Sequence, residues 1–204
     1  MIFELPAPDA DDSRPLVECI ENRRSIREYT GDFISILNLS QLLFAAQGTT
    51  GSDGKRAIPS AGSVYPLSLH ILARRVSGLE PGIYSHQRDS HSLKLLSNEI
   101  PEAEVTNTGI GEQPWLKDAA FIICVAAQFG KSVEHFASQA PAGERGARYV
   151  YMESGALAQN VHLRATDLGL GAVLVAGFDD DRAKKILKLP PDSEPTALVC
   201  VGRS

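Results

Sequence analysis

The sequence predicts an α+β fold in which one sheet has helices packed around it. Two long segments, 36–47 and 144–168, repeat apolar residues at the helical period. Two others, 67–76 and 119–129, alternate or run continuously apolar, as strands do. Helices and strands do not alternate strictly along the chain, which favours α+β over a parallel α/β sheet. At 204 residues with 43% apolar residues, the chain suits a single domain with its own core.

The N-terminal part divides into an extension and the start of the domain. Residues 1–14 are acidic and proline-containing, so we expect a flexible N-terminal extension before one domain at 15–204. Neither a basic segment nor an apolar run is present there, so we do not interpret it as a signal peptide. We predict helices at 15–22 and 36–47. The second has one apolar face, made by Ile36, Leu39, Leu42, Leu43 and Ala46.

The middle of the chain should form strands. Residues 67–76 alternate well enough for one strand. Glycine and proline in "SGLEPGIY" then turn the chain into short strands at 82–86 and 91–96. The unbroken apolar run at 119–129 predicts a strand buried on both faces, at the centre of the sheet.

The C-terminal part should begin with the longest helix, 144–168, which Gly169 would end. A strand at 170–176, a helix at 180–188 and a strand at 196–201 would follow. The long helix has an apolar stripe in steps of three or four, made by Ala147, Val150, Ser154, Leu157, Val161, Ala165 and Leu168.

Composition limits the function classes. A net charge of −5 argues against a nucleic-acid-binding protein, whose basic residues would be in excess. No apolar run approaches the roughly 20 residues of a membrane-spanning helix. Cys19, Cys124 and Cys200 are odd in number and lie in apolar surroundings, which favours reduced core thiols in a cytoplasmic protein. The five histidines show no metal-ligand grouping, so we expect no metal site.

Three stretches could carry chemistry. "RRSIREY", from Arg23 to Tyr29, offers guanidinium groups and a hydroxyl to a phosphate, or is a solvated helix end. "PSAGSVYP", residues 59–66, allows close backbone approach to a flat group, or is an ordinary capped loop. "LGLGAVLVAGFDDD", residues 168–181, could aim backbone N–H groups at a ligand, or is a plain strand-to-helix turn. A phosphate-loop interpretation of "GTTGSDGKR" fails on spacing, so that stretch is taken as a flexible loop.

Together and in this order, these stretches resemble the flavin-dependent nitroreductase family, specifically its SagB-type dehydrogenase branch. Further matches are "LSQLLFAAQG", "GLEPGIYSH", "QPWLKDAAFIIC", "RYVYMESGALAQNVHLRATDLGLG" and the closing "VCVGRS". They extend over residues 20–203. The resemblance implies a mostly antiparallel central sheet between helices, and an intertwined homodimer with one FMN at each of two subunit interfaces.

The resemblance also implies roles for single residues. Arg23, Ser25 and Arg27 would hold the FMN phosphate and ribityl end, with Arg24 acting mostly through its backbone and Arg203 reaching the same phosphate. Arg27 is also the candidate cation near flavin N1 and O2. Pro59, Ser60 and Ala61, with Gly62 nearby, would meet the isoalloxazine ring from the partner subunit, and Gln113 would contact the flavin. Ala176 and Gly177 would aim a backbone N–H at flavin N5, which carries the hydride, so no catalytic side chain is required.

One departure bears on the reaction. SagB-type members that oxidise azolines use a Lys-Tyr pair as base, whereas this chain has only Arg148-Tyr149, and arginine is a poor proton acceptor. Segment 131–146 lies where relatives build a variable substrate cover. Tyr65, Trp115, Phe129 and Phe136 could stack on a substrate or belong to the core.

The leading interpretation is an FMN-dependent oxidoreductase that passes hydride from NAD(P)H through the flavin to a flat acceptor such as a nitroaromatic or a quinone. Two alternatives stay open. One is a dehydrogenase that oxidises a peptide or small metabolite, and the other is a non-catalytic flavin-binding protein.

Overall fold

The computed structural model describes residues 1–8, 13–51 and 53–204. Its centre is a seven-stranded sheet in the order β1-β8-β7-β5-β9-β11-β10, in which every neighbouring pair is antiparallel. The strands are β1 (Ile2–Glu4), β5 (Leu67–Ala73), β7 (Gly82–Gln87), β8 (Ser92–Ser97), β9 (Phe121–Ala127), β10 (Gly171–Val175) and β11 (Glu194–Gly202). The predicted α+β class is confirmed.

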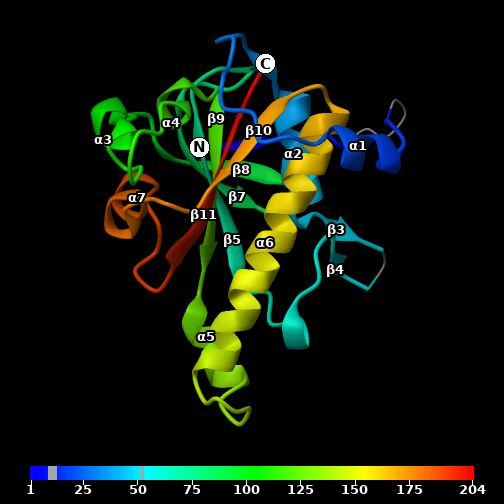
Figure 1. Cartoon of the computed structure of the whole chain (residues 1–204), viewed down its shortest axis with the longest axis vertical. Helices are drawn as coiled ribbons and strands as arrows, with labels where there is room; N and C mark the ends of the chain where they lie inside the picture. Colours follow the sequence, from blue (N-terminus) through cyan, green and yellow to red (C-terminus); the bar gives the residue numbers. More distant parts are fainter. Residues whose placement is uncertain (9–12, 52) are drawn as a thin grey trace.

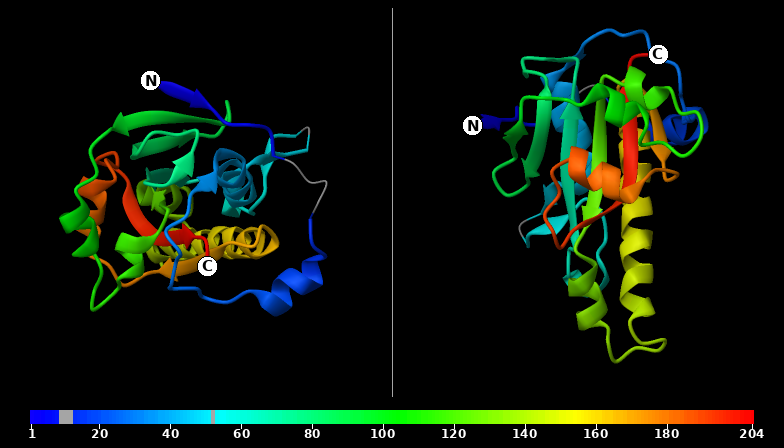
Figure 2. Two further views of the ribbon diagram at one scale, coloured as in Figure 1. Left: turned by 90° about the horizontal axis from the view of Figure 1, so that it is seen from above. Right: turned by 90° about the vertical axis from the view of Figure 1, so that its left-hand side faces the viewer.

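Helices lie on both faces of this sheet (Figure 1). One face is covered by α2 (Ile36–Gln47) and α6 (Glu144–Asp167), and the other by α3 (Glu102–Thr106), α4 (Trp115–Asp118) and α7 (Asp180–Ile186). Figure 2 shows the three layers from above and from the side. Outside these layers, α1 (Leu16–Asn22) contacts α6, while α5 (Phe129–His135) packs on the N-terminal part of α6.

Successive side chains of β9 point to opposite faces of the sheet, so this strand contributes to two hydrophobic clusters. Phe121, Ile123 and Val125 point into the cluster beneath α2 and α6. The residues between them, such as Ile122 and Cys124, point into the cluster beneath α4 and α7. Because both faces are buried, the strand is apolar throughout, as the sequence predicted.

Two small pairings complete the backbone. Ile34–Ser35 (β2) pairs in parallel with Val76–Ser77 (β6), and Thr49–Thr50 (β3) pairs with Lys55–Arg56 (β4). The second pair lies within the predicted flexible loop, of which residue 52 is outside the described residues. The predicted strand 67–76 is therefore interrupted: β5 ends at Ala73, and β6 belongs to another sheet.

The expected flexible extension does not hold for its first residues. Ile2–Glu4 form edge strand β1 on β8, and Leu5 is buried. The Phe3 ring packs edge-on against Tyr84, with 5.8 Å between ring centroids, so the strand gains an apolar contact as well as backbone hydrogen bonds. Residues 9–12 of the predicted extension lie outside the described residues.

The three cysteines are buried and free, as predicted for core thiols. Burial raises the pKa of each thiol, which disfavours the reactive thiolate. Within the described ranges, no helix combines the length and apolar character needed to cross a membrane.

Candidate functional site

The arginine-rich segment lies along the edge of the main sheet, beside β10. Ser25 forms a parallel bridge with Ala172, and the Ile26 N–H donates to the Ala172 carbonyl at 2.9 Å. The Tyr29 hydroxyl donates to the carbonyls of Ile26 and Cys200, at 3.0 and 3.1 Å. These contacts fix the backbone of residues 25–29 against the last two strands.

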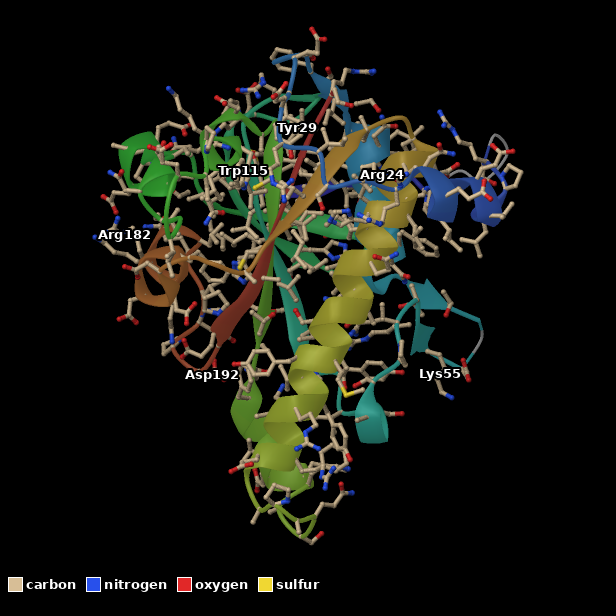
Figure 3. All side chains as sticks on the ribbon, viewed as in Figure 1. Arg24, Tyr29, Lys55, Trp115, Arg182 and Asp192 are labelled. Atoms are coloured by element: carbon tan, nitrogen blue, oxygen red, sulfur yellow. The ribbon has the colours of Figure 1, made fainter. Side chains whose placement is uncertain are left out.

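The three arginines of this segment have different surroundings. Arg24 folds back, and its guanidinium donates to the carbonyls of Glu21 and Arg23 at 2.9 and 2.8 Å. The Arg27 guanidinium lies 5.4 Å from the ring centroid of Trp115, a cation–π contact. Arg23 is half-buried. Figure 3 shows Tyr29 and Trp115 at the same end of the molecule, with Arg24 beside α1.

Gln113 and Gly177 meet across the same surface. The Gln113 amide donates to the Gly177 carbonyl at 2.6 Å, and the Ile110 N–H donates to the same oxygen at 2.9 Å. Two donors therefore hold the peptide that follows β10. Both Ala176 and Gly177 are exposed, and a Cβ added at Gly177 would come no nearer than 3.7 Å to a neighbouring atom.

Arg203 completes this surface at the end of β11. Its carbonyl accepts from the Thr30 N–H at 2.9 Å, and its Nε donates to the Phe33 carbonyl at 3.3 Å. Residues 25–30 and Ser204 line an open hollow of about 690 Å³. The folded chain thus brings together Arg23–Arg27, Gln113, Ala176–Gly177 and Arg203, which are far apart in sequence.

Two polar side chains near this surface have buried ring nitrogens that lack a hydrogen-bond partner among the described residues. One is the indole Nε1 of Trp115, beside Arg27. The other is His162 on α6, both of whose ring nitrogens are unpartnered. Burial, and next the positive charge of Arg23, lower the pKa of His162 to about 4. Buried groups without partners are uncommon in native proteins and call for an explanation.

The segment Pro59–Gly62 lies elsewhere in the folded chain. It includes the 3₁₀ turn Ala61–Ser63 (η1) and lies beside the N-terminal half of α6, away from β10 (Figure 1). The Ala61 N–H donates to the carboxylate of Glu153 on α6 at 2.8 Å. This segment is therefore not part of the arginine surface of the same chain.

Of the four aromatic side chains that the sequence offered as possible substrate contacts, not all lie at the arginine surface. Trp115 borders the arginine surface, whereas Tyr65 stacks under Arg56, with the guanidinium 4.0 Å from the ring centroid. Phe136 is buried between His135 and Tyr149, and Phe129 packs against Tyr151. For Phe136, a core position is therefore the better description.

Sequence reasoning missed Glu153 and His162. Both lie on α6 in the helical stripe that faces the interior. Glu153 follows Val150 by three positions and precedes Leu157 by four. The sequence alone therefore places this carboxylate on the apolar face of the helix.

Comparison with known proteins places the chain in a class of α+β oxidoreductases. The chain belongs to the Nitroreductase family, whose model matches residues 20–203. A protein of Methanocaldococcus jannaschii that is provisionally named a nitroreductase is 36% identical over 201 residues, covering 98% of this chain and 96% of that protein.

Solved structures agree on the fold. A provisionally assigned nitroreductase from Ralstonia eutropha JMP134 superposes with a TM-score of 0.80 at 24% identity, over 100% of this chain and 89% of that one. The NADPH:FMN oxidoreductase of Vibrio harveyi, solved with NAD+, gives a TM-score of 0.63 at 19% identity, over 92% of this chain and 68% of that one.

Proposed function

We propose that this protein is an FMN-dependent oxidoreductase that passes hydride from NAD(P)H through the flavin to a flat acceptor, such as a nitroaromatic or a quinone. The observation that carries the proposal is the meeting of Arg23–Arg27, Gly177 and Arg203 along one edge of the sheet. Family membership supports the same reaction class.

The chemistry of the surface fits FMN. Guanidinium groups and the Ser25 hydroxyl suit a phosphate dianion, since arginine offers several charge-assisted hydrogen bonds. The unpartnered Trp115 indole and His162 imidazole are polar groups that a bound ligand could satisfy. The hollow of about 690 Å³ is within the size range of small-molecule sites.

Each residue has a role in this proposal. Arg23, Ser25 and Arg203 would hold the phosphate and ribityl end, while Arg27, oriented by Trp115, would place positive charge near the pyrimidine edge of the ring. When bound, FMN would supply the hydride-accepting N5. The backbone at Ala176–Gly177, where the Gly177 carbonyl accepts from Gln113, would direct an N–H donor to that atom and stabilise developing charge without reorganisation.

A homodimer would complete the site. Pro59–Gly62 is remote from the arginine surface within one subunit, so a second copy would have to bring it to the ring. Exposed apolar side chains on α1 and α6, including Leu16, Ile20 and Met152, offer surface for a large interface. Light scattering of the flavin-loaded protein should report a dimer, and a stable flavin-loaded monomer would contradict this arrangement.

Within the family, the motifs favour the SagB-type branch, but not azoline oxidation. Tyr149 follows Arg148 rather than a lysine, and its hydroxyl donates to the Gln139 side chain at 3.0 Å. That tyrosine therefore lacks the basic partner it would need to remove a proton.

The test is turnover by the purified protein. We expect visible flavin absorbance on purification and rapid NADH or NADPH consumption with menadione or nitrofurazone. Flavin reduction only by a peptide or small metabolite would instead indicate a dehydrogenase. A bound flavin that neither NADH, NADPH nor an organic substrate reduces would indicate a non-catalytic flavin-binding protein.

A further inference from the structure

The loop after Pro59 has a backbone that needs external support. Gly62, Ser63 and Tyr65 have φ values of 58°, 55° and 50°, in the left-handed region. Glycine adopts this region freely, but serine and tyrosine do so at a cost. Such conformations persist only where the surroundings determine them, and they concentrate at ligand sites.

Glu153 supplies that support from α6. Glu153 is only 6% exposed, and its carboxylate accepts a hydrogen bond from the Ala61 N–H at 2.8 Å. The two residues are 92 positions apart in the sequence. The carboxylate also interacts with the side chain of Ser60. Ser60 Oγ in turn accepts the Tyr65 N–H at 2.9 Å, which closes the loop on itself.

The position of Glu153 is itself fixed by the sheet. The next residue, Ser154, lies 2.7 Å from the Thr196 hydroxyl on β11, and Thr196 donates to the Val125 carbonyl on β9 at 3.0 Å. Hydrogen bonds therefore tie α6 to the centre of the sheet at Ser154 and to the loop at the adjacent Glu153.

The loop also packs against the end of α5. A Cβ at Gly62 would lie 2.7 Å from His135 Nε2 and 3.0 Å from the Phe136 ring, so this glycine permits the α5 end to approach. Segment 131–146, where the sequence showed no motif, thus contacts the loop directly. The loop therefore contacts both the Glu153 carboxylate and the aromatic rings of His135 and Phe136.

From this geometry we infer that Glu153 is a positioning residue that holds Pro59–Gly62 in the shape required to receive the flavin ring of the neighbouring subunit. This inference rests on the proposed function for the identity of the ligand. The loop requires a hydrogen-bond acceptor at position 153, because Ala61 and Ser60 both present donors there. These donors also offset the free-energy cost of burying a carboxylate. Burial accordingly raises the pKa of Glu153, while the hydrogen bonds from Ala61 and Ser60 lower it.

Two variants separate acceptor function from simple packing. Glu153→Gln keeps an oxygen that can accept the Ala61 N–H, whereas Glu153→Leu keeps bulk but leaves that N–H unpaired. Glu144→Gln, at the exposed start of the same helix, is the matched control. Each variant is examined by FMN fluorescence titration, by thermal unfolding and by amide hydrogen exchange of residues 59–65 without FMN.

We expect Glu153→Leu to weaken FMN binding about tenfold or more and to speed loop exchange at an unchanged unfolding temperature. Glu153→Gln should stay within about threefold of the wild type, because the acceptor survives. Wild-type FMN affinity and loop exchange in Glu153→Leu would overturn the inference and leave the proposed function intact. Failure of the wild type to bind FMN would refute the proposed function, and with it the flavin part of the inference, whereas the hydrogen-exchange result would still decide the role of Glu153 in the loop.

Discussion

Mild acid should destabilise this protein through His162, by an amount that follows from its burial. The residue is 5% exposed, neither ring nitrogen has a partner among the described residues, and its pKa falls from 6.5 to about 4. In the unfolded chain the imidazole recovers its ordinary pKa. The unfolded state therefore takes up a proton first, and stability falls as the pH drops below about 6.5, with the loss complete near pH 4.

The magnitude follows from proton linkage. Between about pH 7 and about pH 5, the unfolded imidazole becomes largely protonated while the folded one stays neutral, which costs about 2 kcal/mol. His86 on β7 has the same lowered pKa of about 4, owing to burial and then to His91, and should contribute a similar amount.

The assay is urea unfolding of the flavin-free protein at both pH values, for the wild type and for His162→Leu. Leucine cannot take up a proton, so the variant should lose about 2 kcal/mol less than the wild type on acidification. His86→Leu should show the same reduction, and the double variant should add the two. Equal losses in wild type and His162→Leu would show that His162 is protonated in the folded state, and the reasoning from burial would be refuted.

Three further outcomes are expected. Arg23→Ala should weaken FMN binding by about 2 kcal/mol and hardly change riboflavin binding. Arg24→Ala should weaken FMN binding less, because the Arg24 guanidinium is hydrogen-bonded to carbonyls at the end of α1. Titration with both ligands checks this. Gly177→Val should slow flavin reduction in stopped-flow experiments yet leave the unfolding temperature unchanged, since the chain has room for a side chain there. Gly146→Ala should lower the free energy of unfolding, measured in urea, by about 2 kcal/mol or more, because the new Cβ would come 2.3 Å from a carbonyl oxygen of α5. Gly155→Ala, on the same helix, should not, because no atom lies within 4 Å of its new Cβ.

The regular elements were predictable because burial imposes a period on the sequence. The predicted bounds of α2 match those in the structure, since five apolar residues mark its inner face and Ser35 caps its start by accepting the Asn38 N–H at 3.1 Å. By contrast, β1 has three residues, too few to show a period, and depends on the edge of β8. The helices α3 and α4 were not predicted because they are likewise too short to show a helical period.

The candidate surface was only partly predictable. The arginine segment and Gly177 were found by their residue types and order, but the bonds that join them to Gln113 and β10 depend on tertiary packing. The left-handed conformations at Ser63 and Tyr65 run against the preferences of both residue types. The contact that we infer to hold this loop joins Ala61 to Glu153, 92 residues away in the chain.

The place of β11 in the sheet has a consequence for biosynthesis. Of the strands that the structure describes, it is the last in sequence, yet it lies between β9 and β10 and pairs with both. While the chain is still on the ribosome, β9 therefore presents an open edge along "FIICVAA", an apolar run rich in β-branched residues. The domain can close only when residues 194–202 have left the exit tunnel. We expect a nascent chain stalled before β11 to expose this edge and to be retained by holding chaperones, and the release of β11 to complete the fold in one late step.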